Sequence, residues 1–157
     1  MTIVEDTRNQ GGKHNNIHAY CEANGIQIIR SKMIVGDYTL PTNQKVCIDT
    51  KQDMKEVYGN LTEYRRFHNE YSLAEELGIT LVILIEDEDI KSIDDVTGWV
   101  NPVQKKFEQG KVKAKPRPSS AIATQMRTIA EKHGVRWEFC HPRDTGRRII
   151  EILTEGG

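Results

Sequence analysis

The sequence has few of the features that mark membrane-bound or secreted proteins. Its longest apolar run covers residues 81–85, which is far too short to cross a bilayer. Residues 1–6 lack the basic and apolar regions of a signal peptide. Cys21, Cys47 and Cys140 are odd in number and scattered, which predicts reduced thiols and argues against a structural zinc site. These absences predict a cytoplasmic protein with no membrane partner.

The chain also lacks an excess of basic residues. Its 157 residues carry a net charge of −1, unlike the strongly basic composition of many nucleic-acid binders. The charge is unevenly distributed, because residues 86–95 hold six acids and one base and residues 105–117 hold six bases and one acid. A metal-dependent enzyme can concentrate its basic groups in one patch, so near-neutrality counts only weakly against a nucleic-acid substrate.

Alternating strand and helix patterns predict one α/β domain with a mixed sheet. Predicted strands cover residues 2–5, 26–30, 34–37, 46–51, 81–85 and 135–140, and the apolar run 81–85 is expected to be buried on both faces. Predicted helices cover residues 14–24, 60–77, 119–132 and 145–153, with a helical turn at 53–58. Asn60 is the expected N-cap of the second of these helices, with Glu63 reaching back to it.

The chain divides into three parts on this pattern. Residues 1–90 form the predicted core, and residues 91–118 are expected to be a loop or a mobile basic arm, since Pro and Gly flank a lysine-rich stretch. Residues 119–157 are a helix–strand–helix that either extends the main sheet or packs on it as a small appendage.

The most informative residues are Asp37, Asp49 and Lys51. Asp49 and Lys51 lie two apart on a predicted strand and therefore project from the same face. The strand that ends at Asp37 precedes it across a short turn, so the Asp37 carboxylate can join them. Two carboxylates can hold a divalent cation and an ammonium beside them can hold a phosphate, a combination that suits metal-assisted hydrolysis of a phosphodiester. The ordinary structural alternative is that Asp37 is a turn residue and that Asp49 and Lys51 form a surface ion pair.

Four segments in this order resemble the nuclease domain of the XPF/Mus-type structure-specific endonucleases, within the PD-(D/E)xK, restriction-endonuclease-like superfamily. They are Asp6-Thr7-Arg8, Gly36-Asp37-Tyr38, Asp49-Thr50-Lys51 and the strand that ends at Glu86. The resemblance covers residues 2–86 and is greatest to small stand-alone phage or bacterial members. It implies a restriction-endonuclease-like core with a central mixed sheet flanked by helices, to which this chain adds its C-terminal helix–strand–helix.

The resemblance also implies roles for individual residues. Asp37 and Asp49 would be ligands of Mg²⁺ or Mn²⁺, the backbone carbonyl of Thr50 would complete the shell, and Asp6 would lie near the ion. Lys51 would polarise the attacking water and contact the phosphate, and Arg8 would contact a phosphate or pair with an acid. The implied activity is that of a DNA endonuclease acting on branched or structured DNA, and a homodimer is compatible with the family.

Three departures from the family pattern keep alternatives open. Thr50 stands where the family has Arg, and Lys55 stands where the family has an acid four positions after the Lys; the nearest acid is Asp53. No helix-hairpin-helix pair is recognisable after the core. The first two departures leave a non-catalytic nucleic-acid-binding module as the alternative function, and the third leaves the substrate preference and dimerisation of the family open for this chain. An α/β nucleotide-binding domain is a weak third, because neither G-x-G-x-x-G nor a P-loop is present.

Basic side chains outside the motif are candidates for contacts with the DNA backbone, which are sequence-blind and sensitive to salt. Two of them begin the long predicted helix and six lie in the basic segment. The candidates are Arg65, Arg66, Lys105, Lys106, Lys111, Lys113, Lys115 and Arg117. A solvated surface is the ordinary alternative for all eight.

Overall fold

The computed structural model describes residues 1–9, 12 and 14–155. Within these residues, six strands form one sheet in the order β2-β1-β3-β4-β5-β6. The strands are β1 (Thr2–Glu5), β2 (Gln27–Arg30), β3 (Tyr38–Thr39), β4 (Val46–Lys51), β5 (Thr80–Glu86) and β6 (Arg136–Cys140). β3 is antiparallel to both of its neighbours and the other neighbouring pairs are parallel. The carboxyl ends of the five other strands therefore share one edge of the sheet.

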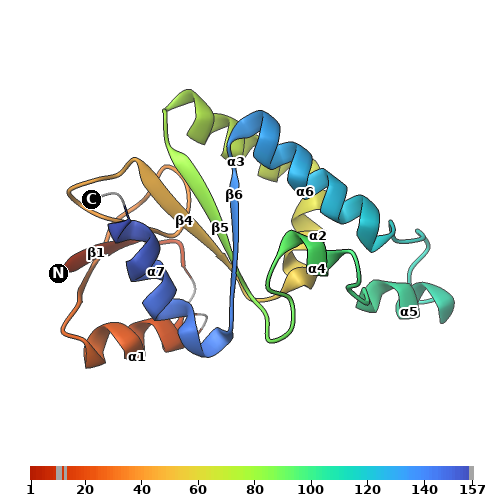
Figure 1. Ribbon diagram of the computed structural model, residues 1–157, viewed down its shortest axis with the longest axis horizontal. Coiled ribbons are helices and arrows are strands. Elements are labelled where there is room, and N and C mark those ends of the chain that lie inside the picture. The colour runs from red at the N-terminus through yellow and green to blue at the C-terminus, as the bar shows by residue number, and fades with distance from the viewer. Residues whose placement is uncertain (10–11, 13, 156–157) are drawn as a thin grey trace.

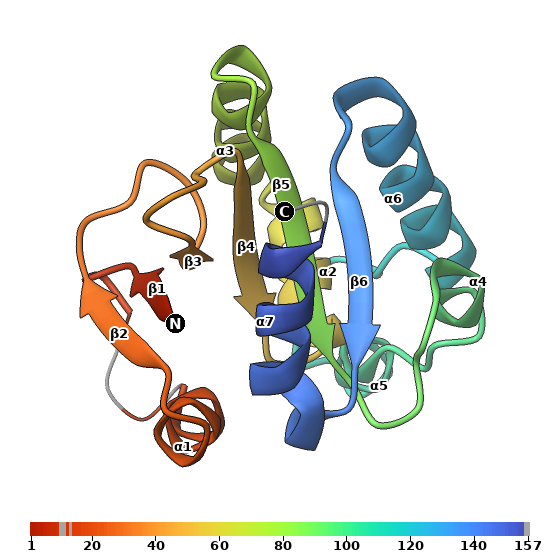
Figure 2. The same cartoon turned by 60° about the vertical axis from the view of Figure 1, so that its left-hand side comes forward.

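Helices cover both faces of this sheet (Figures 1 and 2). One face carries α1 (Asn15–Ala23) and α7 (Thr145–Thr154), and the other carries α2 (Met54–Thr62), α3 (Tyr64–Glu76) and α6 (Ser119–His133). The short helices α4 (Ile93–Val96) and α5 (Pro102–Glu108) connect β5 to α6, and a 3-10 turn (Pro142–Asp144) precedes α7. No helix in the described part of the chain is long and apolar enough to span a membrane.

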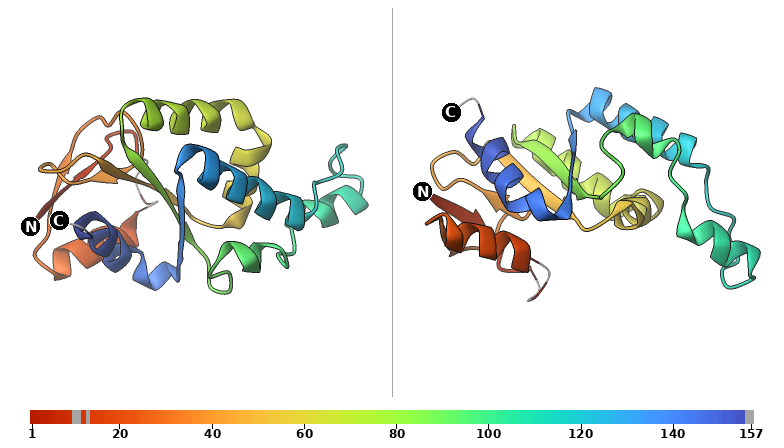
Figure 3. Two further views of the ribbon diagram at one scale, coloured as in Figure 1. Left: turned by 45° about the horizontal axis from the view of Figure 1, so that its top comes forward. Right: turned by 60° about the horizontal axis from the view of Figure 1, so that its bottom comes forward.

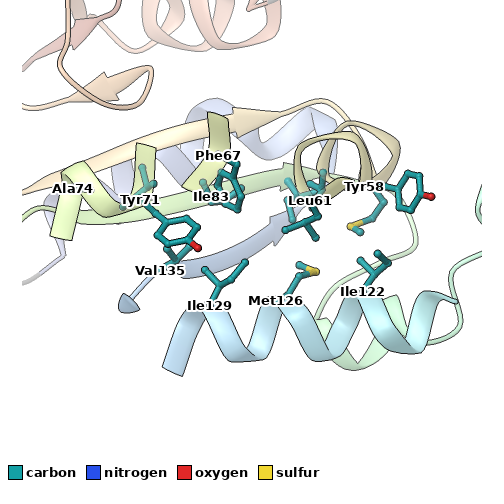
Figure 4. Close-up of a cluster of buried hydrophobic side chains, with 14 of the residues drawn as sticks. Tyr58, Leu61, Phe67, Tyr71, Ala74, Ile83, Ile122, Met126, Ile129 and Val135 are labelled. Carbon is teal, nitrogen blue, oxygen red and sulfur yellow. The ribbon is translucent and has the colours of Figure 1, made fainter. Parts of the chain in front are cut away.

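The core lies on both sides of β5, as the continuous apolar run predicts. Its residues Leu81 to Ile85 are at most 2% exposed. Ile83 belongs to the hydrophobic cluster under α2, α3 and α6, and Val82 belongs to the cluster under α1 and α7. Figure 4 shows the first cluster, in which side chains of α3 and α6 close over the sheet. Burial of each such side chain contributes roughly 1.5–3 kcal/mol, which fixes α3 against the sheet.

Three local predictions are wrong. The chain bends at residues 34–37, so β3 begins after Asp37 instead of ending on it; Gly36 has φ 77°, a left-handed conformation that a strand cannot continue through. The helical turn predicted at 53–58 is a full helix that runs to Thr62, so Asn60 lies inside α2 and is not a cap. The break falls instead at Glu63, whose φ of −89° and ψ of 62° are not helical.

The segment predicted as a loop contains two short helices. The Oδ1 atom of Asn101 accepts a hydrogen bond from the amide of Val103 at 3.0 Å, and Pro102 follows Asn101 at the first turn, so α5 begins there. Ser92 caps α4 in the same way. Beyond α6, β6 pairs with β5 and so extends the main sheet, while α7 returns across the opposite face and packs beside α1.

Candidate active site

Asp37 is held in the sheet by its own backbone. Its amide donates to the carbonyl of Ile48 at 2.7 Å, and its carbonyl accepts from the amide of Asp6 at 2.8 Å. The residue therefore continues the ladder just beyond β3, between the ends of β1 and β4. This places Asp6, Asp37 and Asp49 at the shared edge of the sheet, where the carboxyl ends of the parallel strands meet.

Gly36 lets the chain reach this position. A Cβ at residue 36 would lie 3.0 Å from the carbonyl oxygen of Ile48 and 3.3 Å from Cβ of Cys47. Its φ of 77° is also in the left-handed region, which side chains disfavour. Only glycine meets both demands, so the Gly-Asp pair is a steric requirement of the turn that presents Asp37.

The carboxylate of Asp37 is fixed by the residue that replaces the family's Arg. Oδ2 of Asp37 accepts hydrogen bonds from both the amide and the hydroxyl of Thr50, each at 2.9 Å. Thr50 thus acts through its amide and side chain as a clamp on Asp37, a role that the sequence did not suggest.

Asp49 and Lys51 lie on the face of β4 that α2 and α3 cover. Their side chains are each 11% exposed, and Nζ of Lys51 lies 3.3 Å from Oδ2 of Asp49. The charge of Asp49 also acts on the carboxyl of Asp37, and both residues line the same cavity. The structure therefore brings together the three side chains that the motif singled out, at the floor of one site.

Asp6 and Arg8 stand at the rim of the same site. Asp6 is 4% exposed, and its Oδ2 accepts from Nε of Arg8 at 2.8 Å. Arg8 also donates to the carbonyl of Met33 at 2.6 Å, and the amide of Met33 donates to Oδ1 of Asp6 at 3.1 Å. Of the two roles that the resemblance leaves for Arg8, the structure places it in the ion pair with an acid.

A cavity of about 570 Å³ opens over these residues. The polar part of its lining comes from the sheet edge and from α2 and α3. These residues are Asp6, Arg8, Asn9, Asp37, Asp49, Lys51, Glu56, Asn60, Glu63, Arg66, Asn69 and Glu70. The five residues named as catalytic from the sequence are all among them, and Arg66 is the one basic candidate of α3 that also lines the cavity.

Glu70 is the main site residue that the sequence did not single out. It projects from α3 into the same cavity, where the charge of Asp49 acts on its carboxyl. Within the described residues, no N–H or hydroxyl group donates to its buried Oε1 atom. The available signal is its position beside the apolar stripe of Phe67, Tyr71 and Ala74, but an acid on the flank of a stripe is ordinarily solvated.

Burial and mutual repulsion change the protonation of these acids. Burial, and then the charge of Asp49, raise the pKa of Asp37 to about 7, against the two hydrogen bonds from Thr50 that lower it. The same two causes raise the pKa of Glu70 to about 9. For Lys51, burial lowers the pKa, but the charges of Asp49, Glu70 and Glu56 outweigh it and the net shift is upward. Near neutral pH these shifts favour the protonated form of Glu70 and partial protonation of Asp37.

A second polar network lies on the opposite face of the sheet and supports the first. Glu5 is 1% exposed, and its Oε2 accepts from the hydroxyl of Tyr38 at 2.5 Å and lies 2.6 Å from Nε2 of His18. Nε of Arg30 lies 3.3 Å from its Oε1. Since Tyr38 directly follows Asp37, this network fixes the backbone beside the site. The sequence did not suggest a role for Glu5.

Solved structures share this architecture. The chain matches XPF from Aeropyrum pernix with a TM-score of 0.66 and 17% identity, over 98% of this chain and 63% of that one. It matches XPF from Aeropyrum pernix in complex with DNA with a TM-score of 0.63 and 18% identity, over 97% of this chain and 62% of that one. The chain has an XPF-type nuclease fold. This confirms the predicted α/β class with a mixed sheet flanked by helices.

The XPF-type fold extends through the half of the chain that carries no recognisable motif. The match includes α6, β6 and α7, yet this chain spans only about three-fifths of the length of the solved XPF chains. No family model and no curated protein matches the sequence. The likeness therefore rests on the arrangement of helices and strands and not on the sequence.

The donor set at the edge of this XPF-type sheet fits a hard divalent cation. Asp37, Asp49 and Glu70 present carboxyl oxygens, and a buried oxygen without a donor is stabilised by a proton or a cation. In the described part of the chain, no three acid, His or Cys side chains are already grouped to hold an ion. Mg²⁺ commonly binds through one or two carboxylates with waters and phosphate oxygens, and Asp37 and Asp49 can supply such a pair.

Most of the basic candidates lie outside the cavity. Lys105, Lys106, Lys111, Lys113 and Lys115 are exposed on α5 and the segment after it, which projects at one end of the molecule (Figure 3). Arg117 is exposed but donates to Oε1 of Gln125 at 2.7 Å and to the carbonyl of Leu61 at 3.3 Å. It therefore joins this basic segment to α2, one wall of the cavity.

Proposed function

We propose that the chain is a Mg²⁺- or Mn²⁺-dependent DNA endonuclease that hydrolyses phosphodiester bonds in branched or structured DNA. The observation that carries this proposal is the meeting of Asp37, Asp49 and Lys51 at the floor of an open cavity. The XPF-type fold supports it, because the residues of this chain that resemble the XPF/Mus-type motif lie together at one edge of that sheet. The solved XPF complex with DNA supports DNA as the substrate class.

Each residue then has a task that follows from its chemistry. Asp37 and Asp49 would hold the ion, with the carbonyl of Thr50 and with Asp6 beside it. A bound divalent ion would neutralise charge on the phosphate and favour ionisation of a water. Lys51 would turn from Asp49 to the phosphate, where its ammonium stabilises the developing negative charge. Thr50 and Arg8 would keep Asp37 and Asp6 in place.

Basic residues around the cavity would hold the DNA backbone. Arg66 lines the cavity itself, and the basic segment at 105–117 is joined to α2 through Arg117. A duplex that lies across the cavity could therefore contact both. Such contacts position the DNA without reading its sequence.

Removal of three charges from the basic segment is expected to weaken DNA binding and its salt dependence. Each phosphate contact contributes about 0.9 to the slope of log K against log salt, so replacing Lys111, Lys113 and Lys115 by Ala should lower the slope by about two to three. Fluorescence anisotropy over a range of salt concentrations measures this. Lys45→Ala with Lys132→Ala, on exposed lysines elsewhere, is the matched control. An unchanged slope would exclude this segment from the interface.

The proposed activity is tested by a cleavage panel. Purified protein should cut at least one of forked, flapped, four-way or single-stranded DNA with Mg²⁺ or Mn²⁺, and chelation should stop the reaction. Asp49→Asn is the inactive control, which separates this activity from a contaminating nuclease. If no substrate is cut with either ion, the enzyme proposal fails.

A non-catalytic DNA-binding module is the second candidate. One observation favours it: Lys51 already neutralises Asp49 at 3.3 Å, so the acids are partly satisfied without an ion. Such a module would bind DNA but show no Mn²⁺ affinity that depends on Asp37 and Asp49. Calorimetric titration with Mn²⁺ distinguishes it from the endonuclease.

A further inference from the structure

The acid expected four positions after the motif Lys is absent, and the first turn of α2 does not replace it. Lys55 occupies that position and is exposed to solvent. Asp53 is the N-cap of α2, where its Oδ1 accepts from the amide of Glu56 at 2.8 Å. Asp53 does not line the cavity. The nearest acid in the sequence therefore has a capping task.

Glu56 lines the cavity but also has a local partner. Its Oε2 accepts from the amide of Gln52 at 2.9 Å, a contact that closes the chain between β4 and α2. It also raises the pKa of Lys51 through its charge. Glu56 thus holds the loop between β4 and α2.

Glu70 reaches the same point from another element. The buried Phe67, Tyr71 and Ala74 fix the rotation of α3 against the sheet, and this rotation directs Glu70 into the cavity. Its carboxyl lines the same cavity as the carboxyls of Asp37 and Asp49 and the ammonium of Lys51. Its buried Oε1 atom accepts no hydrogen bond from the described residues.

The charges around Asp49 point to a cation. Asp37, Asp49 and Glu70 line the cavity with Lys51, so full ionisation of these four groups would leave an excess of two negative charges around the buried Asp49. A divalent ion balances that excess, and carboxylate oxygens are the ligands that Mg²⁺ and Mn²⁺ prefer.

We propose that Glu70 supplies the third acid of the cation-binding centre, from helix α3, in place of the acid that is missing at position 55. This inference rests on the proposed function. It changes the composition of the centre from that of the family pattern, because one of its acids comes from a helix that packs on the sheet and not from the segment that follows the motif strand.

The test is Mn²⁺ binding by calorimetry, with no DNA present. Glu70→Gln keeps the shape of the side chain and should weaken Mn²⁺ binding at least about tenfold. Asp53→Asn should bind Mn²⁺ like the unchanged protein. Glu76→Gln, at an exposed position of the same helix, is the matched control and should also bind normally. Circular dichroism of each variant verifies that it is folded.

Two outcomes overturn the inference in different ways. If Glu70→Gln binds Mn²⁺ like the unchanged protein while Asp49→Asn does not, Glu70 is not part of the centre but the proposed function stands. If the unchanged protein itself does not bind Mn²⁺, the inference and the metal-dependent function fail together. A tenfold loss in Asp53→Asn with none in Glu70→Gln would assign the third acid to Asp53 instead.

Discussion

Replacement of Asp49 by Asn is expected to reduce metal-dependent DNA cleavage by about three orders of magnitude or more. Loss of an ion that contributes several kcal/mol of transition-state stabilisation has an effect of this size, since each 1.36 kcal/mol corresponds to tenfold in rate. Asp49 is the carboxylate on which Asp37, Lys51 and Glu70 converge. An amide of the same shape cannot supply the negative charge that the ion requires.

The same substitution should leave the protein folded and able to bind DNA. Asn fills the volume of Asp and removes a buried charge, and the basic residues proposed to hold the DNA backbone, Arg66 and those of segment 105–117, lie on other elements. Single-turnover cleavage at saturating Mn²⁺, with anisotropy and thermal melting of the same preparation, measures all three properties. Asp53→Asn serves as the control with normal activity. Cleavage by Asp49→Asn within about tenfold of the unchanged protein would contradict the assigned centre.

The metal-free protein is expected to lose stability as the pH rises from about 5 to about 9. The folded-state pKa values of Asp37, about 7, and Glu70, about 9, lie above their ordinary values of 3.8 and 4.5. Over this interval the folded chain keeps protons that the unfolded chain releases, so the free energy of unfolding falls by up to about 1.4 kcal/mol per pH unit and group. Coupling reduces the sum, and we expect a loss on the order of 3 kcal/mol. The upward shift of Lys51 acts only above this interval, near its ordinary pKa of 10.5.

Glu70→Gln should remove much of this dependence. At pH 8.5 in EDTA the variant is expected to be more stable than the unchanged protein by about 2 kcal/mol, because it no longer buries an acid against Asp49. Urea unfolding across the pH range, with Glu76→Gln as the control, measures the difference. Added Mn²⁺ should stabilise the unchanged protein most at high pH. A stability that rises between pH 5 and 9 without metal would show that these acids are not raised in pKa.

Local patterns predicted the part of the site that lies on neighbouring strands. Asp49 and Lys51 share a face because side chains alternate along a strand, and the Gly36-Asp37 pair is one turn away. The burial of β5 on both faces was likewise predictable from its continuous run of apolar residues. These features follow from a few adjacent residues, which is why they were predictable.

The position of Glu70 in the site depends on the packing of α3 and not on adjacent residues. A single helix beginning at Asn60 gives one rotation for all its side chains, but the break at Glu63 resets the rotation of α3. The packing of Phe67 and Tyr71 decides which side of α3 faces the sheet edge. Both residues are far from the motif in the sequence. The clamp from Thr50 was hidden for a similar reason, since it requires the position of an amide between two strands.

The two hydrogen bonds of the Asp37 backbone limit the substitutions that the fold tolerates at this position. β3 is only two residues long, yet it is the element that joins the β2-β1 pair to the β4-β5-β6 half of the sheet. Asp37 lengthens this seam by one residue, with one bond to each half. A proline at this position would delete the hydrogen bond from the Asp37 amide to Ile48 and weaken the join between the halves, quite apart from the lost carboxylate. The cohesion of the sheet and the proposed ion binding therefore both depend on Asp37. A substitution at this residue changes both properties together.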